Sequence, residues 1–208
     1  MNLYKILFYL VGLFIISFGV TLTIKADLGA GAWDALNVGL STTIGLTVGT
    51  WVIIVGSILI FLNAYLLKER PDFLAFITVL LVGFFIDFWL IFALSEWTPD
   101  NLAYRVVLLL LGLGILSFGI ATYLQANYPL IPIDNFMMAL RARFKLNLSV
   151  AKTVGELTAL ILALLFQGPI GIGTLIITFG IGPSIQFFFP KMEMALKKLQ
   201  HKQVSPSH

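Results

Sequence analysis

Asp34 and Asp134 are the leading candidates for binding a substrate or an ion. They are acidic residues in a chain of which only 11% is charged. Gly29 and Gly31 precede the first aspartate, prolines precede the second, and both kinds of residue break a preceding helix. An acid at membrane depth is costly and usually faces a bundle interior, a water-filled cavity or a partner. We therefore expect Asp34, Asp134 and the neighbouring Trp33 to contribute to a site.

A structural role is the alternative for both aspartates. Each stands where a short helix needs an acceptor for its free N–H groups, so each could simply cap that helix. The second helix is amphipathic, with Phe136, Leu140 and Phe144 on one face and Arg141 and Lys145 on another, as in helices that lie at a membrane surface. The tryptophans mostly fall near the expected interfaces, as aromatic belt residues do.

Glu156 is the acid that we expect to carry a proton or cation if transport is coupled to one. It lies about 14 Å along its helix, which is close to the middle of a membrane. Lys152 stands four residues earlier, on the same helix face, so the two side chains could instead form a locked ion pair.

Asp87 lies within "VGFFIDFWLIF", and its counterpart in an internal repeat is the neutral Gln186. Counting about 25 Å from the loop at Arg70 places Asp87 near the outer end of its helix. Both residues are candidates for the site, and the alternative for Asp87 is an acid that reaches solvent.

The elements that carry these residues are transmembrane helices. Hydrophobic residues make up 59% of the chain and the mean hydropathy is +1.00, which leaves too little polar sequence to cover a soluble globule. A span needs about 20 apolar residues, and hydrocarbon cannot hydrogen-bond an open backbone, so strands are not expected. The apolar runs predict six helices, at residues 5–26, 48–67, 73–94, 104–126, 147–166 and 172–190.

The chain contains an internal duplication. The segment that begins "GLFIISFG" at Gly12 recurs as "GLGILSFG" at Gly112, and the offset of 100 holds as far as the two aspartates. Because each half has three spans, the second half enters the membrane from the opposite side. We predict an all-α membrane protein of two inverted three-helix repeats, residues 1–98 and 99–190, followed by a basic tail, residues 191–208. Each repeat has a short broken helix, re-entrant or interfacial, after its first span.

Lysine and arginine are distributed unevenly between the two sides of this topology. Eleven of them fall on one side, whereas only Lys25 and Arg105 fall on the other. The excess marks the cytoplasmic side, so we expect both termini to be cytoplasmic. The same distribution explains the net charge of +3 without a nucleic-acid partner.

Enzyme chemistry is not expected. The chain has no cysteine, its histidines are confined to the tail, and it carries no metalloprotease, nucleophile-elbow or P-loop motif. We expect neither a metal site nor a cofactor.

The stretch "ADLGAGAWDAL", with "GLTVGT" and "GTLIITFGIGPSIQF", resembles the YczE/YyaS/YitT-type family of bacterial integral membrane proteins. Such proteins carry "A-x-L-G-x-x-P-W-D" after the first span, and here Ala32 replaces the proline. The resemblance implies this fold and a location in the bacterial inner membrane, but it supplies no substrate.

Two functions are compatible with these features. The first is a small-solute permease or channel-like transporter with a site between the repeats, where helix N-termini would suit anionic or zwitterionic solutes. The alternative is a non-transporting scaffold or regulatory partner of another membrane protein. Besides the lipid bilayer, the expected partners are an unidentified solute or membrane protein, and a homo-oligomer is compatible with the sequence.

Overall fold

The structure is a computed structural model that describes residues 3–204, and these residues contain helices and no strand. Six helices are long and apolar enough to cross a membrane, and each begins within two residues of its predicted start. An all-helical chain with six candidate spans is therefore confirmed. The elements in order are α1 (Leu3–Lys25), α2 (Ala32–Ile44), α3 (Val48–Leu67), α4 (Phe73–Asp87), a π-helix η1 (Phe88–Ala93) that continues α4, α5 (Leu102–Leu124), α6 (Pro132–Phe144), α7 (Leu148–Leu165) and α8 (Ile172–Val204).

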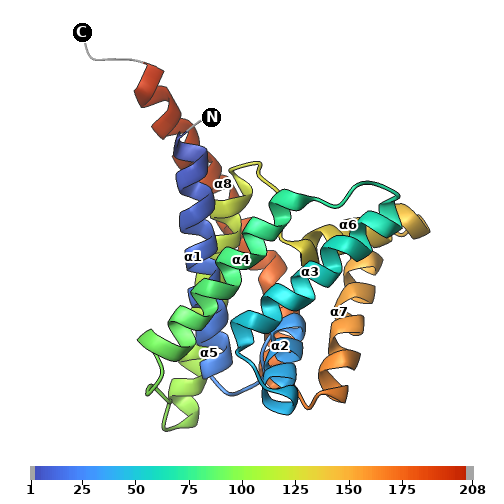
Figure 1. Ribbon diagram of the computed structural model, residues 1–208. Coiled ribbons are helices and arrows are strands. Elements are labelled where there is room, and N and C mark those ends of the chain that lie inside the picture. Colours follow the sequence, from blue (N-terminus) through green and yellow to red (C-terminus); the bar gives the residue numbers. More distant parts are fainter. Residues whose placement is uncertain (1–2, 205–208) are drawn as a thin grey trace.

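The centre of the bundle is a close antiparallel pair, α1 and α5 (Figure 1). A Cβ atom added at Gly12 would lie 2.6 Å from the backbone nitrogen of Tyr123, and one added at Gly19 would lie 2.5 Å from that of Leu116. These distances are shorter than real contacts, so only glycine lets the two backbones approach this closely, as small residues do in membrane bundles.

The helices α3 and α4 form a second antiparallel pair. Gly49 and Gly83 face each other where they cross, and a Cβ atom at Gly49 would lie 2.1 Å from the carbonyl oxygen of Gly83. Lys68 ends α3 in a left-handed conformation, and the Asp72 side chain caps the start of α4. The tight hairpin follows from these two caps and the two glycines.

The segment after α1 and the segment before α8, which both interrupt apolar runs, are joined by backbone hydrogen bonds. In the glycine-rich stretch after α1, Ala30 donates to the carbonyl of Pro169 over 3.0 Å, and Leu28 accepts from the nitrogen of Gly173 over 2.7 Å. Gly29 has a φ of +103°, and a Cβ atom there would lie 2.5 Å from the nitrogen of Gly171. The connection before α2 is thereby fixed on the connection before α8.

The short helices α2 and α6 each pack on helices from both halves of the chain. Helix α2 contacts α7 and α3, and α6 contacts α3 and α7. Most residues of α2 are buried, and in α6 Phe136 and Leu140 are buried whereas Phe144 is exposed. The first half of α6 therefore packs its apolar face on the bundle, and its placement at a membrane surface stays a prediction.

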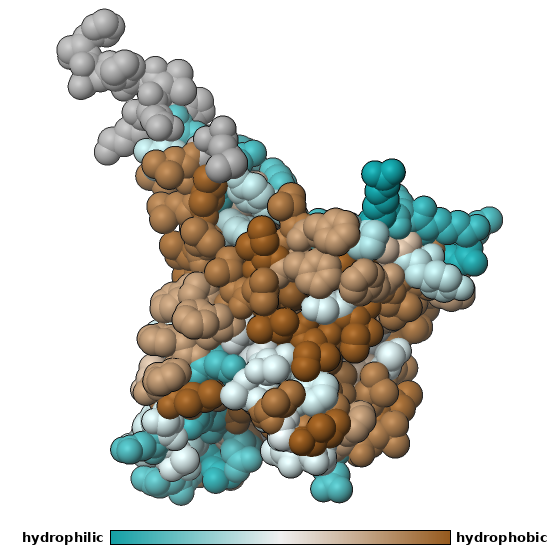
Figure 2. Space-filling view, in the orientation of Figure 1, coloured by the Kyte–Doolittle hydropathy of each residue, from teal (hydrophilic) through white to brown (hydrophobic). Residues whose placement is uncertain are grey.

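The outer surface suits a lipid environment. Figure 2 shows a broad apolar belt, with hydrophilic residues gathered at its lower edge and its upper right. Near one end, Lys25 donates to the carbonyl of Ser95, and Arg105 forms an ion pair of 3.0 Å with Asp27. The start of α1 and the end of α8 lie at the opposite end, where α8 continues past Pro190 as a projecting helix (Figure 1). Residues 205–208 of the tail lie outside the described residues.

Candidate functional site

A cavity of about 210 Å³ lies among the middle portions of the long helices and the first turns of α2 and α6. Its walls are mostly valine, leucine and isoleucine. Six polar or charged side chains also line it: Asp34, Asn37, Asp134, Lys152, Glu156 and Thr178. The cavity therefore brings together residues from both halves of the chain.

Asp34 is the third residue of α2 rather than its cap. The helix begins at Ala32 after Gly31, and no side chain makes a capping hydrogen bond. The structure therefore contradicts the capping interpretation, because the Asp34 carboxylate faces the cavity. Burial, and then the negative charge of Glu156, raises the pKa of Asp34 to about 7.

Asp134 occupies the equivalent third position of α6, whose N-cap Ile131 also has no capping side chain. Its carboxylate accepts a hydrogen bond of 2.7 Å from the hydroxyl of Tyr123. Burial raises the pKa of Asp134, while the Tyr123 hydrogen bond and the Lys152 ammonium oppose the rise. Asp134 therefore has a hydrogen-bond donor and a nearby positive charge that both favour its carboxylate form.

The surroundings of the two aspartates differ. The residue 100 positions before Tyr123 is Thr23, whose hydroxyl donates to the carbonyl of Val20 instead. No residue that the structure describes donates a hydrogen bond to the Asp34 carboxylate.

Glu156 and Lys152 both line the cavity from α7, one helical turn apart. The spacing predicts an ion pair, but within residues 3–200 no Lys152 nitrogen comes within 4.0 Å of a Glu156 oxygen, so the locked pair is not formed. The positive charge of Lys152 also lowers the pKa of the Asp134 carboxyl.

Asp87 and Gln186 are not at the cavity. The Asp87 carboxylate accepts from the Thr47 hydroxyl over 2.5 Å and from the Gly49 nitrogen over 2.7 Å. It thereby ties the end of α4 to the first turn of α3, which is a structural role rather than free contact with solvent. Gln186 lies on α8 and does not line the cavity.

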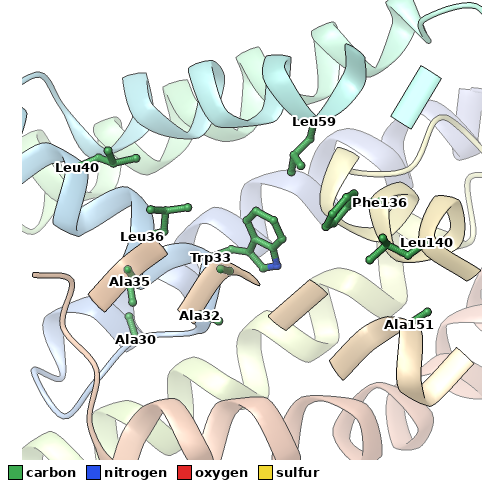
Figure 3. Packing of buried hydrophobic residues seen from close by; sticks show 12 residues of the cluster. Ala30, Ala32, Trp33, Ala35, Leu36, Leu40, Leu59, Phe136, Leu140 and Ala151 are labelled. Carbon is green, nitrogen blue, oxygen red and sulfur yellow. The ribbon is translucent and has the colours of Figure 1, made fainter. Parts of the chain in front are cut away.

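Trp33 lies at the junction of the two short helices and is only 8% exposed, so it is not a belt residue. Its indole packs edge to face on the Phe136 ring, with centroids 6.0 Å apart. Figure 3 shows this pair with Leu36 and Leu59 nearby. The indole also lines the cavity, so it can contact both the apolar cluster and a bound molecule.

Asn37 and Thr178 are cavity residues that the sequence reasoning missed. Asn37 is 3% exposed, yet its side-chain oxygen has no hydrogen-bond partner among the described residues, and the same holds for the Thr178 hydroxyl. Asn37 follows Asp34 by one turn on one helix face, a signal that could have found it. No sequence pattern marks Thr178.

Comparisons with known proteins show the family of this chain. The chain matches the group described as "Family of unknown function (DUF6198)" over residues 3–190. The chain belongs to the DUF6198 family. Two similar proteins come from Bacillus subtilis (strain 168). The "Uncharacterized protein YyaS" is 36% identical over 189 residues, covering 91% of this chain and 94% of the relative. The "Uncharacterized membrane protein YczE" is 33% identical over 187 residues, covering 88% and 85%.

A third relative of this DUF6198 chain is an "Uncharacterized protein" of Haemophilus influenzae (strain ATCC 51907 / DSM 11121 / KW20 / Rd), which is 27% identical over 179 residues. That match covers 86% of this chain and 80% of the relative. No solved structure matches. The YyaS and YczE matches confirm the resemblance inferred from the glycine-rich motif and agree with a multi-pass membrane protein.

Proposed function

We propose that this DUF6198 protein is a small-solute permease of the bacterial inner membrane, built from two inverted repeats whose shared cavity is the solute site. The observation that carries the proposal is the cavity itself. Three carboxyl groups, one ammonium and two unpartnered polar side chains face one apolar-walled space in the middle of the bundle. Burying such groups is costly, and a polar solute would offset that cost. The proposal assigns no catalytic step.

Equivalent contacts in the two halves support the inverted repeat. Gly12 packs on Tyr123, and the residues displaced by 100, Gly112 and Thr23, pack on each other. Likewise, α2 contacts α7, whereas its counterpart α6 contacts α3, the counterpart of α7. Such reciprocal pairs are expected when a pseudo-two-fold axis relates the halves.

One difference between the halves supports alternating access. Gly83 of α4 is pressed against Gly49 of α3, whereas Gly182, its counterpart on α8, meets nothing within 4 Å. The first hairpin is closed at this level and the corresponding level of α7 and α8 is not. Exchange of these two arrangements would open the cavity to the opposite side, as in other transporters built from inverted repeats.

The orientation in the proposal places both termini in the cytoplasm. The α3–α4 and α6–α7 connections, whose sequences contain lysine or arginine, lie toward the end of the bundle where α1 starts (Figure 1). Lys25 and Arg105, near the other end, have protein partners. Reporter fusions at the termini and in the 95–103 loop test this orientation, which a cytoplasmic signal from that loop would contradict.

The test of the permease uses the absence of cysteine from the chain. Thr178→Cys places one thiol at the cavity, and a membrane-impermeant maleimide is then applied to intact cells and to inverted membrane vesicles. A site with alternating access is labelled from both sides. The matched controls are Ala159→Cys, in a fully buried position that stays unlabelled, and Ser149→Cys, in the exposed first turn of α7, which is labelled only in inverted vesicles. Protection of the introduced cavity thiol on both sides would refute the permease.

One observation favours the alternative scaffold function, namely the projecting end of α8. Lys191, Lys197 and Lys198 lie on a helix that continues past the last predicted span. Removing residues 191–208 separates the functions, because a permease keeps two-sided labelling, whereas an adaptor that acts through the tail loses its partner.

A further inference from the structure

The charges and hydrogen-bond acceptors of the cavity are not evenly distributed. Asp134 has the Tyr123 hydroxyl and the nearby Lys152 charge as partners. Lys152 is the one cationic side chain among the residues that line the cavity. Among the described residues, no side chain donates a hydrogen bond to Asp34 and no cation lowers its pKa. The charged residue that does affect its pKa is Glu156, which is also an acid. A negative group without a partner therefore remains on the α2 side.

Asn37 adds a second acceptor beside it. Asp34 and Asn37 are three residues apart on α2, so both project from the same face, and both line the cavity. The Asn37 side-chain oxygen is buried without a donor. We call these two residues the acceptor corner. A buried acceptor without a partner destabilises the fold, and a bound donor would remove that cost.

We propose that the acceptor corner binds the protonated amine of a small organic cation whose hydrocarbon part packs on the aliphatic walls. This inference rests on the proposed function and names its solute class. An ammonium head supplies N–H donors and a positive charge together, which are the two things that Asp34 and Asn37 lack. The Trp33 indole, which also lines the cavity, provides an aromatic face that favours a cation.

Other ligand classes fit this space less well. An anion would meet three carboxyl groups and one ammonium, so the cavity lining disfavours the anionic members of the expected anionic or zwitterionic solutes. No group of three or more His, Cys, Asp or Glu side chains in the described part of the chain could hold a metal ion. The volume of about 210 Å³ equals roughly seven water molecules at about 30 Å³ each, which suits a compact organic molecule.

A proton and the amine would compete at Asp34. Because burial and the Glu156 charge raise the pKa of Asp34 to about 7, the carboxyl is partly protonated near neutral pH. The other titratable groups facing this space are Asp134 of α6 and Lys152 and Glu156 of α7. Amine binding should therefore tighten as the pH rises from about 6 to about 8, because deprotonation creates the anion that holds the ammonium.

The binding test uses purified full-length protein in detergent micelles and three isosteric probes. Isothermal titration compares isobutylammonium, neutral isobutanol and anionic isobutyrate at pH 8. We expect saturable binding of isobutylammonium, at least about tenfold tighter than binding of either other probe. Equal binding of all three, preference for isobutyrate, or no binding of isobutylammonium would overturn the proposal, and this comparison needs no variant.

Two substitutions then locate the site. Asp34→Asn keeps the shape and removes the charge, and should weaken isobutylammonium binding at least about tenfold. Asp27→Asn removes a carboxylate from an exposed ion pair outside the cavity and should leave the affinity unchanged. Equal affinities of Asp34→Asn and the wild-type protein would contradict the assignment to the acceptor corner.

The binding test and the permease labelling test can fail independently of each other. Two-sided labelling of the Thr178→Cys variant without isobutylammonium binding would reject the cation site and leave the permease standing. Selective binding of isobutylammonium, combined with a Thr178→Cys variant that is labelled from neither side, would establish the cation site and reject transport.

Discussion

Asp34 should make the free protein less stable as the pH rises, and Asp34→Asn should remove that dependence. In the folded protein the pKa of this carboxyl is raised from its ordinary value of 3.8 to about 7 by burial and the Glu156 charge. The folded state therefore holds a proton that the unfolded state releases. The corresponding stability is fully present below pH 3.8 and is lost as the pH rises through about 7.

The magnitude follows from the pKa values. Between the two pKa values, each pH unit changes the free energy of unfolding by about 1.4 kcal/mol. From pH 5 to pH 8 the loss is about 2.7 kcal/mol. For a chain of this size, that corresponds to a decrease of about 5–11 °C in the unfolding midpoint.

The assay is thermal unfolding in detergent at pH 5 and pH 8. The quantity measured is the midpoint of the wild-type protein minus that of Asp34→Asn, which cancels the other titrating groups. This difference should fall by about 5–11 °C between pH 5 and pH 8, whereas the same difference for Asp27→Asn should not change. A difference for Asp34→Asn that is constant or that rises with pH would refute the raised pKa and the burial that causes it.

Three further outcomes follow from particular contacts. Gly12→Ala should destabilise the protein by about 1–3 kcal/mol or more, because its Cβ atom would lie 2.6 Å from the Tyr123 backbone nitrogen. Gly114→Ala, where nothing lies within 4 Å of the added atom, should not, and equal unfolding midpoints would contradict the close α1–α5 approach. Tyr123→Phe removes the hydroxyl that stabilises the Asp134 carboxylate and should lower the unfolding midpoint more at pH 8 than at pH 5; an equal loss at both would exclude this role. Asp87→Ala frees the Thr47 hydroxyl and the Gly49 nitrogen and should cost about 1–3 kcal/mol in unfolding experiments without changing isobutylammonium affinity. Weakened binding would instead connect Asp87 to the site.

The sequence was sufficient for the six candidate spans, because apolar length alone determines whether a helix can cross a bilayer. It also singled out Asp34, Asp134 and Glu156, which share the cavity, since charges interrupting apolar runs are few. The sequence offset of 100 also predicted that the two aspartates hold the same position in two short helices, and each is the third residue of its helix.

Other parts of the site depend on contacts between distant segments. The spacing of Lys152 and Glu156 permits an ion pair, but their side-chain positions in the bundle do not form one. Asp87 resembled a membrane acid with a binding role because the sequence does not reveal that α3 begins beside it. Thr178 became a cavity residue only through the packing of α8, and a lone threonine in an apolar helix carries no signal of its own.

The central claim, that two inverted repeats exchange a closed and an open hairpin around the cavity, is tested most directly by distance measurements on both hairpins. Spin labels replace the exposed pair Ile58 and Leu80 on α3 and α4, and the equivalent exposed pair Leu157 and Phe179 on α7 and α8. We expect pulsed electron paramagnetic resonance to give two distances in each pair, with the short distance in one hairpin favoured under conditions that favour the long distance in the other. One unchanging distance in each pair, with and without isobutylammonium and at pH 5 and pH 8, would contradict it.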